Sequence, residues 1–185
     1  MIKKPKRLHD HISSLYRYAT HFLFNQMTAN KGIKKHGQTA VDALYKEFAQ
    51  LDAKGVFQPM HSSNLSHSQK RSALRAINLI KEKRDGRLKA RTCADGRPER
   101  KIYTKEDTTS PAISTDSLFT ILIKSAKEGR QIATWDIEGA YLLADQDRFV
   151  VVKFEGASVD ILCEVNSDYK RFVVIENGKK VLYLR

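Results

Sequence analysis

The sequence predicts an α+β fold in which antiparallel hairpins accompany two main helices. Strand-like segments outnumber helical ones, and they follow one another with short connections. Two turn signals support hairpins. Asn177-Gly178 is the stronger signal, and Asp85-Gly86 lies inside the strand-like segment 74–93. Both dipeptides are typical of two-residue hairpin turns because their residues tolerate positive φ.

The two helices are predicted from hydrophobic periodicity. In the segment 38–54, apolar side chains recur at three- and four-residue steps, and Gly55 supplies a helix stop. The segment 114–127 begins with residues that cap helix N-termini, continues with the helical period and ends before Gly129.

Further strands are expected where short apolar runs lie between turn residues. Val56 and Phe57, followed by Pro59, indicate a short edge strand. The other strand-like segments are 131–137, 149–154, 159–165, 171–176 and 179–184.

The chain is expected to divide near residue 36. Residues 1–36 are irregular and rich in Lys, His and Asn, which suggests a linker or a basic N-terminal segment. Residues 37–185 are expected to form one domain. The strand-like run that reaches Arg185 has no polar tail after it, which suggests a truncated reading frame.

The charge balance favours a polyanionic partner. Lys and Arg total 33 and Asp and Glu total 21, for a formal net charge of +12. Nucleic acid is the commonest partner of such a surplus. No apolar run approaches the roughly 20 residues that span a bilayer, and no signal peptide core follows the basic N-terminus. We therefore expect a cytoplasmic or nuclear protein with no membrane partner.

One strand of the predicted hairpin carries three cations. With a turn at Asp85-Gly86, strand alternation puts Arg87, Lys89 and Arg91 on one face. Three cations on one face repel one another unless an anion lies among them. A solvated basic edge strand, which also discourages aggregation, explains the pattern equally well.

Asp136 is the best candidate for catalytic chemistry. It follows an apolar segment and precedes Gly139 and Ala140, small residues that leave room beside it. A carboxylate in such a place suits a divalent metal near a substrate. From the residues alone, however, an Asp that caps a strand-to-helix junction is the commoner case.

A family resemblance adds to this pattern. The segment 136–142, Asp-Ile-Glu-Gly-Ala-Tyr-Leu, resembles the first palm motif of reverse transcriptases, in which an Asp and four further residues precede Tyr or Phe. Residues 35–185 are also similar to copia-type retrotransposon enzymes in the order of their landmarks. A helix ending in Gly comes first, then a basic hairpin with Lys89-Ala90-Arg91, then Ser110-Pro111, an apolar helix and the Asp motif, and Glu155-Gly156 follows a strand. The segment 75–87 is especially similar to copia-like elements of diatoms and other algae.

The resemblance implies part of a polymerase right hand, namely the fingers and the start of the palm. It implies RNA-directed DNA polymerase activity. The implied partners are an RNA or DNA template–primer, deoxynucleoside triphosphates and the remainder of a polyprotein. By the same resemblance, Asp136 and the backbone carbonyl of Ile137 would bind divalent ions, two Mg²⁺ in a complete domain. Tyr141 would lie under the sugar of the incoming nucleotide and select deoxynucleotides.

The resemblance also implies which residues contact the phosphates of the nucleotide. Arg91 would contact the triphosphate, because its planar guanidinium grips two oxygens. Lys89 would be a second phosphate contact, with Lys81 or Lys83 of the first hairpin strand as alternatives.

The chain also departs from the family pattern. Thr92-Cys93 stands where many relatives have Leu-Val, which puts the strand packing in doubt. The family's second metal motif, Tyr-x-Asp-Asp, does not occur. One aspartate cannot hold two metals, so the chain is expected to be inactive alone.

Two other functions stay open. On a continuing strand, Asp136 and Glu138 would share a face, and with Asp145 and Asp147 they could form a two-metal nuclease of ribonuclease H or integrase type. The small residues Gly139-Ala140 argue against a continuing strand. The chain could also be a non-enzymatic basic nucleic-acid-binding module, in which Asp136→Asn would leave function intact.

Overall fold

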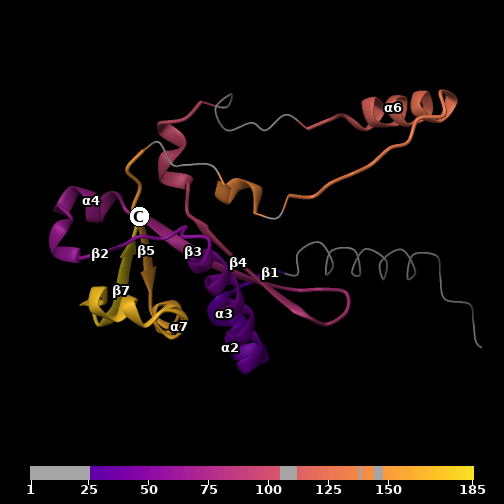
Figure 1. Ribbon diagram of the computed structural model, residues 1–185. Coiled ribbons are helices and arrows are strands. Elements are labelled where there is room, and N and C mark those ends of the chain that lie inside the picture. The colour runs from indigo at the N-terminus through magenta and orange to yellow at the C-terminus, as the bar shows by residue number, and fades with distance from the viewer. Residues whose placement is uncertain (1–25, 105–111, 138, 144–147) are drawn as a thin grey trace, which may run out of the picture. The chain divides into compact units, whose positions relative to one another are not determined.

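The computed structural model describes residues 26–104, 112–137, 139–143 and 148–185, and its chain forms two compact units (Figure 1). Unit 1 combines the described residues up to Asp95 with Phe149–Arg185. Unit 2 is the intervening segment Gly96–Arg148. No described helix is long and apolar enough to cross a membrane.

The strands described in unit 1 form one seven-stranded sheet. The order along it is β1-β3-β5-β7-β2, while β4 pairs with β3 and β6 pairs with β7. The strands are β1 (Gln26–Thr28), β2 (Pro59–Met60), β3 (Leu74–Glu82), β4 (Leu88–Ala94), β5 (Val152–Glu155), β6 (Val174–Glu176) and β7 (Lys179–Leu184).

The sheet is mixed, which corrects the expected antiparallel sheet but remains compatible with an α+β class. β3 and β5 are parallel, with Leu74 opposite Val152 and Arg75 opposite Lys153, and the other pairs are antiparallel. Parallel strands need a long crossover connection. Here the whole of unit 2 lies between the two strands in sequence, so no hairpin turn in the sequence predicts their pairing.

Helices include more than the two predicted ones. The α-helices are α2 (Ala29–His36), α3 (Gln38–Ala53), α4 (His67–Ser72), α6 (Thr115–Lys127) and α7 (Ala157–Val165). The 3₁₀ helices are η1 (Ser62–Asn64), η2 (Arg97–Lys101), η3 (Ala140–Leu143) and η4 (Ser167–Phe172). α3 and α6 confirm the predicted helices. The Ser114 hydroxyl caps α6 by accepting a hydrogen bond from the N–H of Ser117 at 3.1 Å.

Four expected strands need correction. The segment 159–165 is part of α7, and a short apolar run is equally compatible with a buried helix. The segment 131–137 forms no strand, and the described part of unit 2 offers it no partner strand. The edge strand expected at 56–57 lies instead at β2, and the strand expected over 171–176 begins only at β6, after η4.

The Asp85-Gly86 turn also differs from its prediction. The N–H of Lys83 donates to the carbonyl of Arg87 at 2.8 Å, so the loop has three residues, 84–86. Only its Gly86 has a positive φ, of 76°. This combination is the common three-residue hairpin, in which the last loop residue is left-handed. The Asn177-Gly178 turn is confirmed, since both of its residues have positive φ, 50° and 72°.

Residues 26–36 belong to the fold of unit 1, although the sequence places them in an irregular segment. β1 pairs with β3, and α2 packs against β3 and α3. The contact is close at Gly32, where an added Cβ would lie 2.5 Å from Cδ1 of the fully buried Ile80. A glycine at this position lets the α2 backbone approach the sheet.

The main core lies between α3, α7 and the sheet. α3 buries one face, which consists of Ala40, Ala43, Leu44, Phe48 and Leu51. The fully buried Phe154 ring meets Phe48 edge-on at 6.0 Å and Phe57 at 5.5 Å between ring centroids. A second cluster forms where Val181 and Tyr183 pack with Leu65 and Val151.

A polar group accompanies this second cluster. Nζ of Lys153 lies 3.0 Å from Glu155 and 3.2 Å from Glu176, and the Tyr183 hydroxyl donates to Glu176 at 2.9 Å. The hydrogen bond from Lys153 holds the pKa of Glu155 below its ordinary value. Burial and the bond to Glu176 raise the pKa of Tyr183 from 10.0 to about 12.

Ionisation of Tyr183 should lower the free energy of unfolding as pH rises through the alkaline range. Its folded pKa lies above its unfolded value, so its stabilising contribution is complete below pH 10 and declines as pH rises towards about 12. Urea unfolding of the wild type and Tyr183→Phe should therefore differ at pH 9, and the difference should shrink above pH 10. The exposed Tyr45, changed to Phe, is the control. A Tyr183 difference that stays constant up to pH 12 would contradict this assignment.

Candidate anion-binding site

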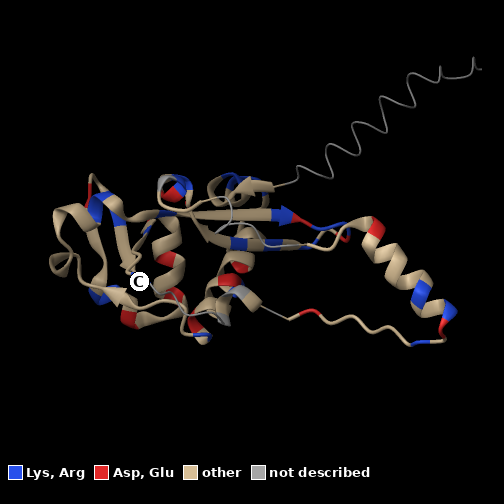
Figure 2. Cartoon of the chain, turned by 90° about the horizontal axis from the view of Figure 1, so that it is seen from above, with Lys and Arg blue, Asp and Glu red and all other residues tan. Residues whose placement is uncertain are grey.

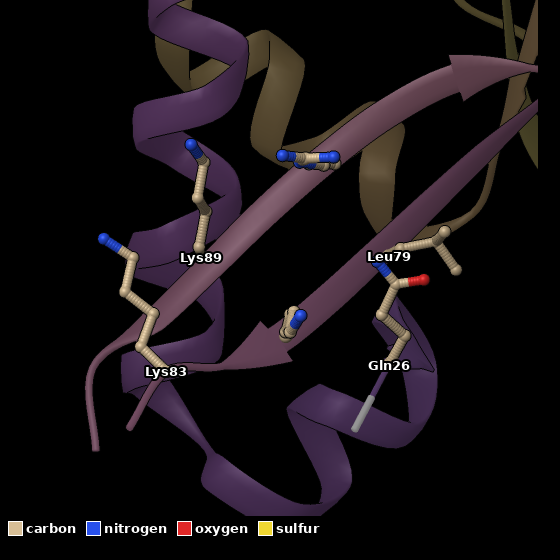
Figure 3. Close-up of a pocket in the computed structure, with 6 residues that line it drawn as sticks. Gln26, Leu79, Lys83 and Lys89 are labelled. Atoms are coloured by element: carbon tan, nitrogen blue, oxygen red, sulfur yellow. The ribbon is translucent and has the colours of Figure 1, made fainter. Parts of the chain in front are cut away.

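Lys and Arg residues are frequent along the β3–β4 hairpin (Figure 2). Several of them line one face of the hairpin. This face contains a pocket of about 240 Å³. Four cations, one amide and one apolar side chain line it (Figure 3), namely Lys81, Lys83, Lys89, Arg91, Gln26 and Leu79. All four cations are exposed.

The register of the strands brings these residues together. Lys81 lies opposite Lys89, and Leu79 lies opposite Arg91. On the other side of β3, Gln26 of β1 lies opposite Lys81. Side chains alternate between the faces of a strand, so these residues share one face. The intervening Ile80 and Ala90 are buried on the other face, where α2 and α3 pack. Burial of one face thus fixes the cations on the other.

None of the four cations of the pocket forms an ion pair with a described carboxylate. The hydrogen bonds of Arg87 lower the pKa of Asp85 and the charge of Lys83 adds to this effect, but the carboxylate itself is bound by Arg87. The nearest acidic neighbour along β3, Glu82, belongs to the opposite face, where it pairs with Lys35 at 3.6 Å.

Like charges directly opposite each other on neighbouring strands are destabilising. Lys81 and Lys89 are such a pair. A bound anion would remove this repulsion.

Arg87 does not line this pocket, contrary to the expected set of three cations. It lies directly after the loop, where its guanidinium and backbone N–H bind the Asp85 carboxylate at distances of 2.6 to 3.0 Å. These hydrogen bonds lower the pKa of Asp85 and raise that of Arg87. The Arg87 guanidinium is bound to Asp85 in the loop and so is not among the side chains that line the pocket.

Hydrogen bonds fix the hairpin to the helices behind it. The N–H of Thr92 donates to Glu47 of α3 at 3.0 Å, and its hydroxyl donates to Asn78 at 2.9 Å. The Asn78 amide in turn donates to the buried Ser158 of α7 at 2.8 Å. Thr92 therefore has defined hydrogen-bond partners on α3 and β3.

The structure brings together the phosphate-contact candidates Arg91, Lys89, Lys81 and Lys83. Sequence reasoning left the choice among the lysines open, and all three line the same pocket. The sequence did not indicate the other two lining residues, Gln26 and Leu79. Alternation along β3 could have indicated Leu79 once the correct turn was known. No signal pointed to Gln26, because β1 has only three residues and lies in a segment without periodicity.

The remaining candidates lie in unit 2. Asp136 is exposed in the irregular segment 131–137, and the carbonyl of Ile137 accepts a hydrogen bond from the N–H of Ala140 at 3.2 Å. The backbone of Tyr141 belongs to η3, but its side chain lies outside the described part of the structure. Glu138, Asp145 and Asp147, which the nuclease alternative requires, also lie outside the described residues.

A metal centre is not formed by the described residues. They contain no group of three or more His, Cys, Asp or Glu side chains that could hold an ion. Asp136 supplies one carboxylate, which does not fit a two-metal site by itself.

Comparisons of the chain with protein-family models, with curated proteins and with solved structures find no match. The function of the chain is therefore inferred from its own residues, namely the pocket of unit 1 and the motifs of the sequence.

Proposed function

We propose that this chain is the fingers and first palm part of an RNA-directed DNA polymerase of the copia retrotransposon type, and that its hairpin pocket binds the triphosphate of a deoxynucleotide. The observation that carries the binding proposal is the group of four cations in one pocket, none of which forms an ion pair with a described carboxylate. The polymerase assignment is supported by the order of motifs between residues 35 and 185.

The chemistry of the pocket suits a polyphosphate. Arg91 presents a planar fork that grips two phosphate oxygens, and the lysines act as mobile point charges. The volume of 240 Å³ is below the roughly 300–1,000 Å³ of sites that enclose a drug-sized ligand. The pocket is therefore sized for part of a nucleotide, and the rest of the ligand would extend beyond it.

Binding and catalysis are assigned to different units in this proposal. The pocket belongs to unit 1, while Asp136, Ile137 and Tyr141 belong to unit 2. The described carboxylates do not complete a two-metal site, so the chain should bind nucleotide without adding it to a primer. The two further carboxylates would come from a Tyr-x-Asp-Asp segment that this sequence lacks.

Nucleotide binding tests the proposal directly. Titration of this chain with a fluorescent deoxynucleoside triphosphate should give saturable binding that weakens steeply with salt, because phosphate contacts are electrostatic. Unlabelled triphosphate should compete. Binding of duplex RNA or DNA that mononucleotides do not compete would favour the basic nucleic-acid module, and absence of nucleotide binding would refute the pocket assignment.

Asp136→Asn separates the two roles. In this chain it should leave triphosphate affinity unchanged, because Asp136 is not part of the pocket. In a domain completed with a Tyr-x-Asp-Asp segment, the same change should abolish primer extension measured on a gel, since the metal ligand is lost. Asp116→Asn, on the exposed first turn of α6, is the matched control for unit 2. Full extension by the Asp136→Asn enzyme would contradict the catalytic assignment.

A further inference from the structure

We propose that Gln26 determines the specificity of the hairpin pocket by hydrogen-bonding the uncharged nucleoside part of its ligand. The inference rests on the proposed function, because it requires that the pocket holds an organic polyphosphate. In this arrangement the cations hold the phosphates, and Gln26 distinguishes a nucleotide from an inorganic polyphosphate.

Gln26 occupies the edge of the pocket away from β4. Across the sheet, Gln26 of β1, Lys81 of β3 and Lys89 of β4 form one row. Figure 3 shows the Gln26 carboxamide with Leu79 on one side of the view and Lys83 with Lys89 on the other. The Gln26 side chain is exposed and has no hydrogen-bond partner among the described residues.

The cations alone cannot select a nucleotide. Lys and Arg side chains carry donors and no acceptor, so they recognise negative charge and phosphate oxygens in any polyphosphate. A carboxamide both donates and accepts, which matches the hydroxyl groups of a sugar and the polar edge of a base. Leu79 adds an apolar surface to the same pocket. Binding of phosphate alone does not require such a surface, whereas sites for organic ligands are lined largely by apolar side chains.

The strand spacing fits a ligand with two chemically different ends. Neighbouring strands lie about 4.8 Å apart, so the backbones of Gln26 and Lys89 are separated by roughly 10 Å across β3. Phosphates held at Lys89 and Arg91 on β4 would therefore place the adjoining nucleoside towards β1.

The position of β1 depends on the helix that follows it. β1 is directly continuous with α2, whose Gly32 lies against Ile80 of β3 with no room for a side chain. This close contact holds α2 on one face of the sheet, and the register of β1 then turns Gln26 to the other face.

Competition binding with two ligands tests this role. The full chain and its variants are titrated with fluorescent dATP, which is displaced by unlabelled dATP or by inorganic tripolyphosphate. Gln26→Ala should weaken dATP about 3- to 10-fold, as expected for one lost hydrogen bond, and leave tripolyphosphate affinity unchanged. The retained tripolyphosphate affinity also shows that the pocket is intact. Gln58→Ala, at an exposed site beside β2, should change neither affinity.

The outcomes separate this inference from the proposed function. Equal weakening of both ligands by Gln26→Ala would mean that Gln26 contacts phosphate, and no weakening of either would mean that it contacts nothing. Either result overturns the specificity role and leaves the nucleotide pocket standing. A wild-type chain that binds neither ligand would refute the proposed function itself, and the inference with it.

Discussion

Lys89→Glu should make the chain more stable and at the same time destroy its phosphate binding. Lys89 lies directly opposite Lys81, so the change turns a repulsive cross-strand pair into an attractive one. Such pairs contribute roughly 0.2–1 kcal/mol, and we expect a gain in unfolding free energy of that order. Triphosphate affinity should fall on the order of 100-fold, because a charge-assisted contact worth about 1.5–3 kcal/mol is replaced by repulsion.

Urea unfolding and nucleotide titration of the same samples measure the two effects. Lys46→Glu is the matched control, since it makes the same charge change at an exposed site on α3, which packs against the other face of the hairpin. We expect it to alter affinity by less than about threefold, because an exposed charge outside the pocket is largely screened at physiological salt. A Lys89→Glu chain that loses stability would show that Lys81 and Lys89 do not repel each other, and equal losses of affinity in both variants would show that only net charge matters.

Phe154→Ala should cause the largest loss of stability of any single change considered. The ring is fully buried on β5 and packs edge-on against Phe48 and Phe57. Removing a buried Phe side chain costs about 3–5 kcal/mol, through lost transfer free energy and the cavity left behind. This is a large part of the roughly 5–15 kcal/mol by which domains are stable.

Phe149→Ala is the control for this prediction. Phe149 is 47% exposed and lies beside the guanidinium of Arg185, 5.4 Å from its ring centre. We expect its replacement to cost less than about 1 kcal/mol, as for most surface changes. Denaturant unfolding followed by circular dichroism measures both. Similar midpoints for the two variants would place the core of unit 1 elsewhere.

Local signals predicted the parts of the fold that are formed by neighbouring residues. α3 and α6 have clear periodicity and caps, and the Asn177-Gly178 turn joins strands that follow each other directly. The parallel pairing of β3 with β5 escaped prediction because it joins residues separated by the whole of unit 2. α7 escaped because an apolar run of its length fits a strand as well as a buried helix.

The candidate site was predicted only in part, for related reasons. Alternation correctly put Lys89 and Arg91 on one face, but the loop length decides which residues of β3 lie opposite them. One residue more in the loop brought Lys81 opposite Lys89, where a two-residue turn would have put it opposite Ala90. Arg87 is bound to Asp85 and does not line the pocket. The place of Gln26 in the pocket depends on the pairing of β1 with β3. No pattern in the three residues of β1 predicts this pairing.

The start of β3 has a consequence for how this chain tolerates change. The N–H of Asp95 donates to the carbonyl of Arg75, and the N–H of Leu74 donates to the carbonyl of Val151, both at 2.8 Å. The two ends of the intervening segment are thus fastened to consecutive residues of one strand. The entropic cost of closing such a loop grows only with the logarithm of its length. Insertions and deletions between residues 96 and 148, outside the motif at 136–142, should therefore accumulate over evolutionary time with little effect on the cationic pocket.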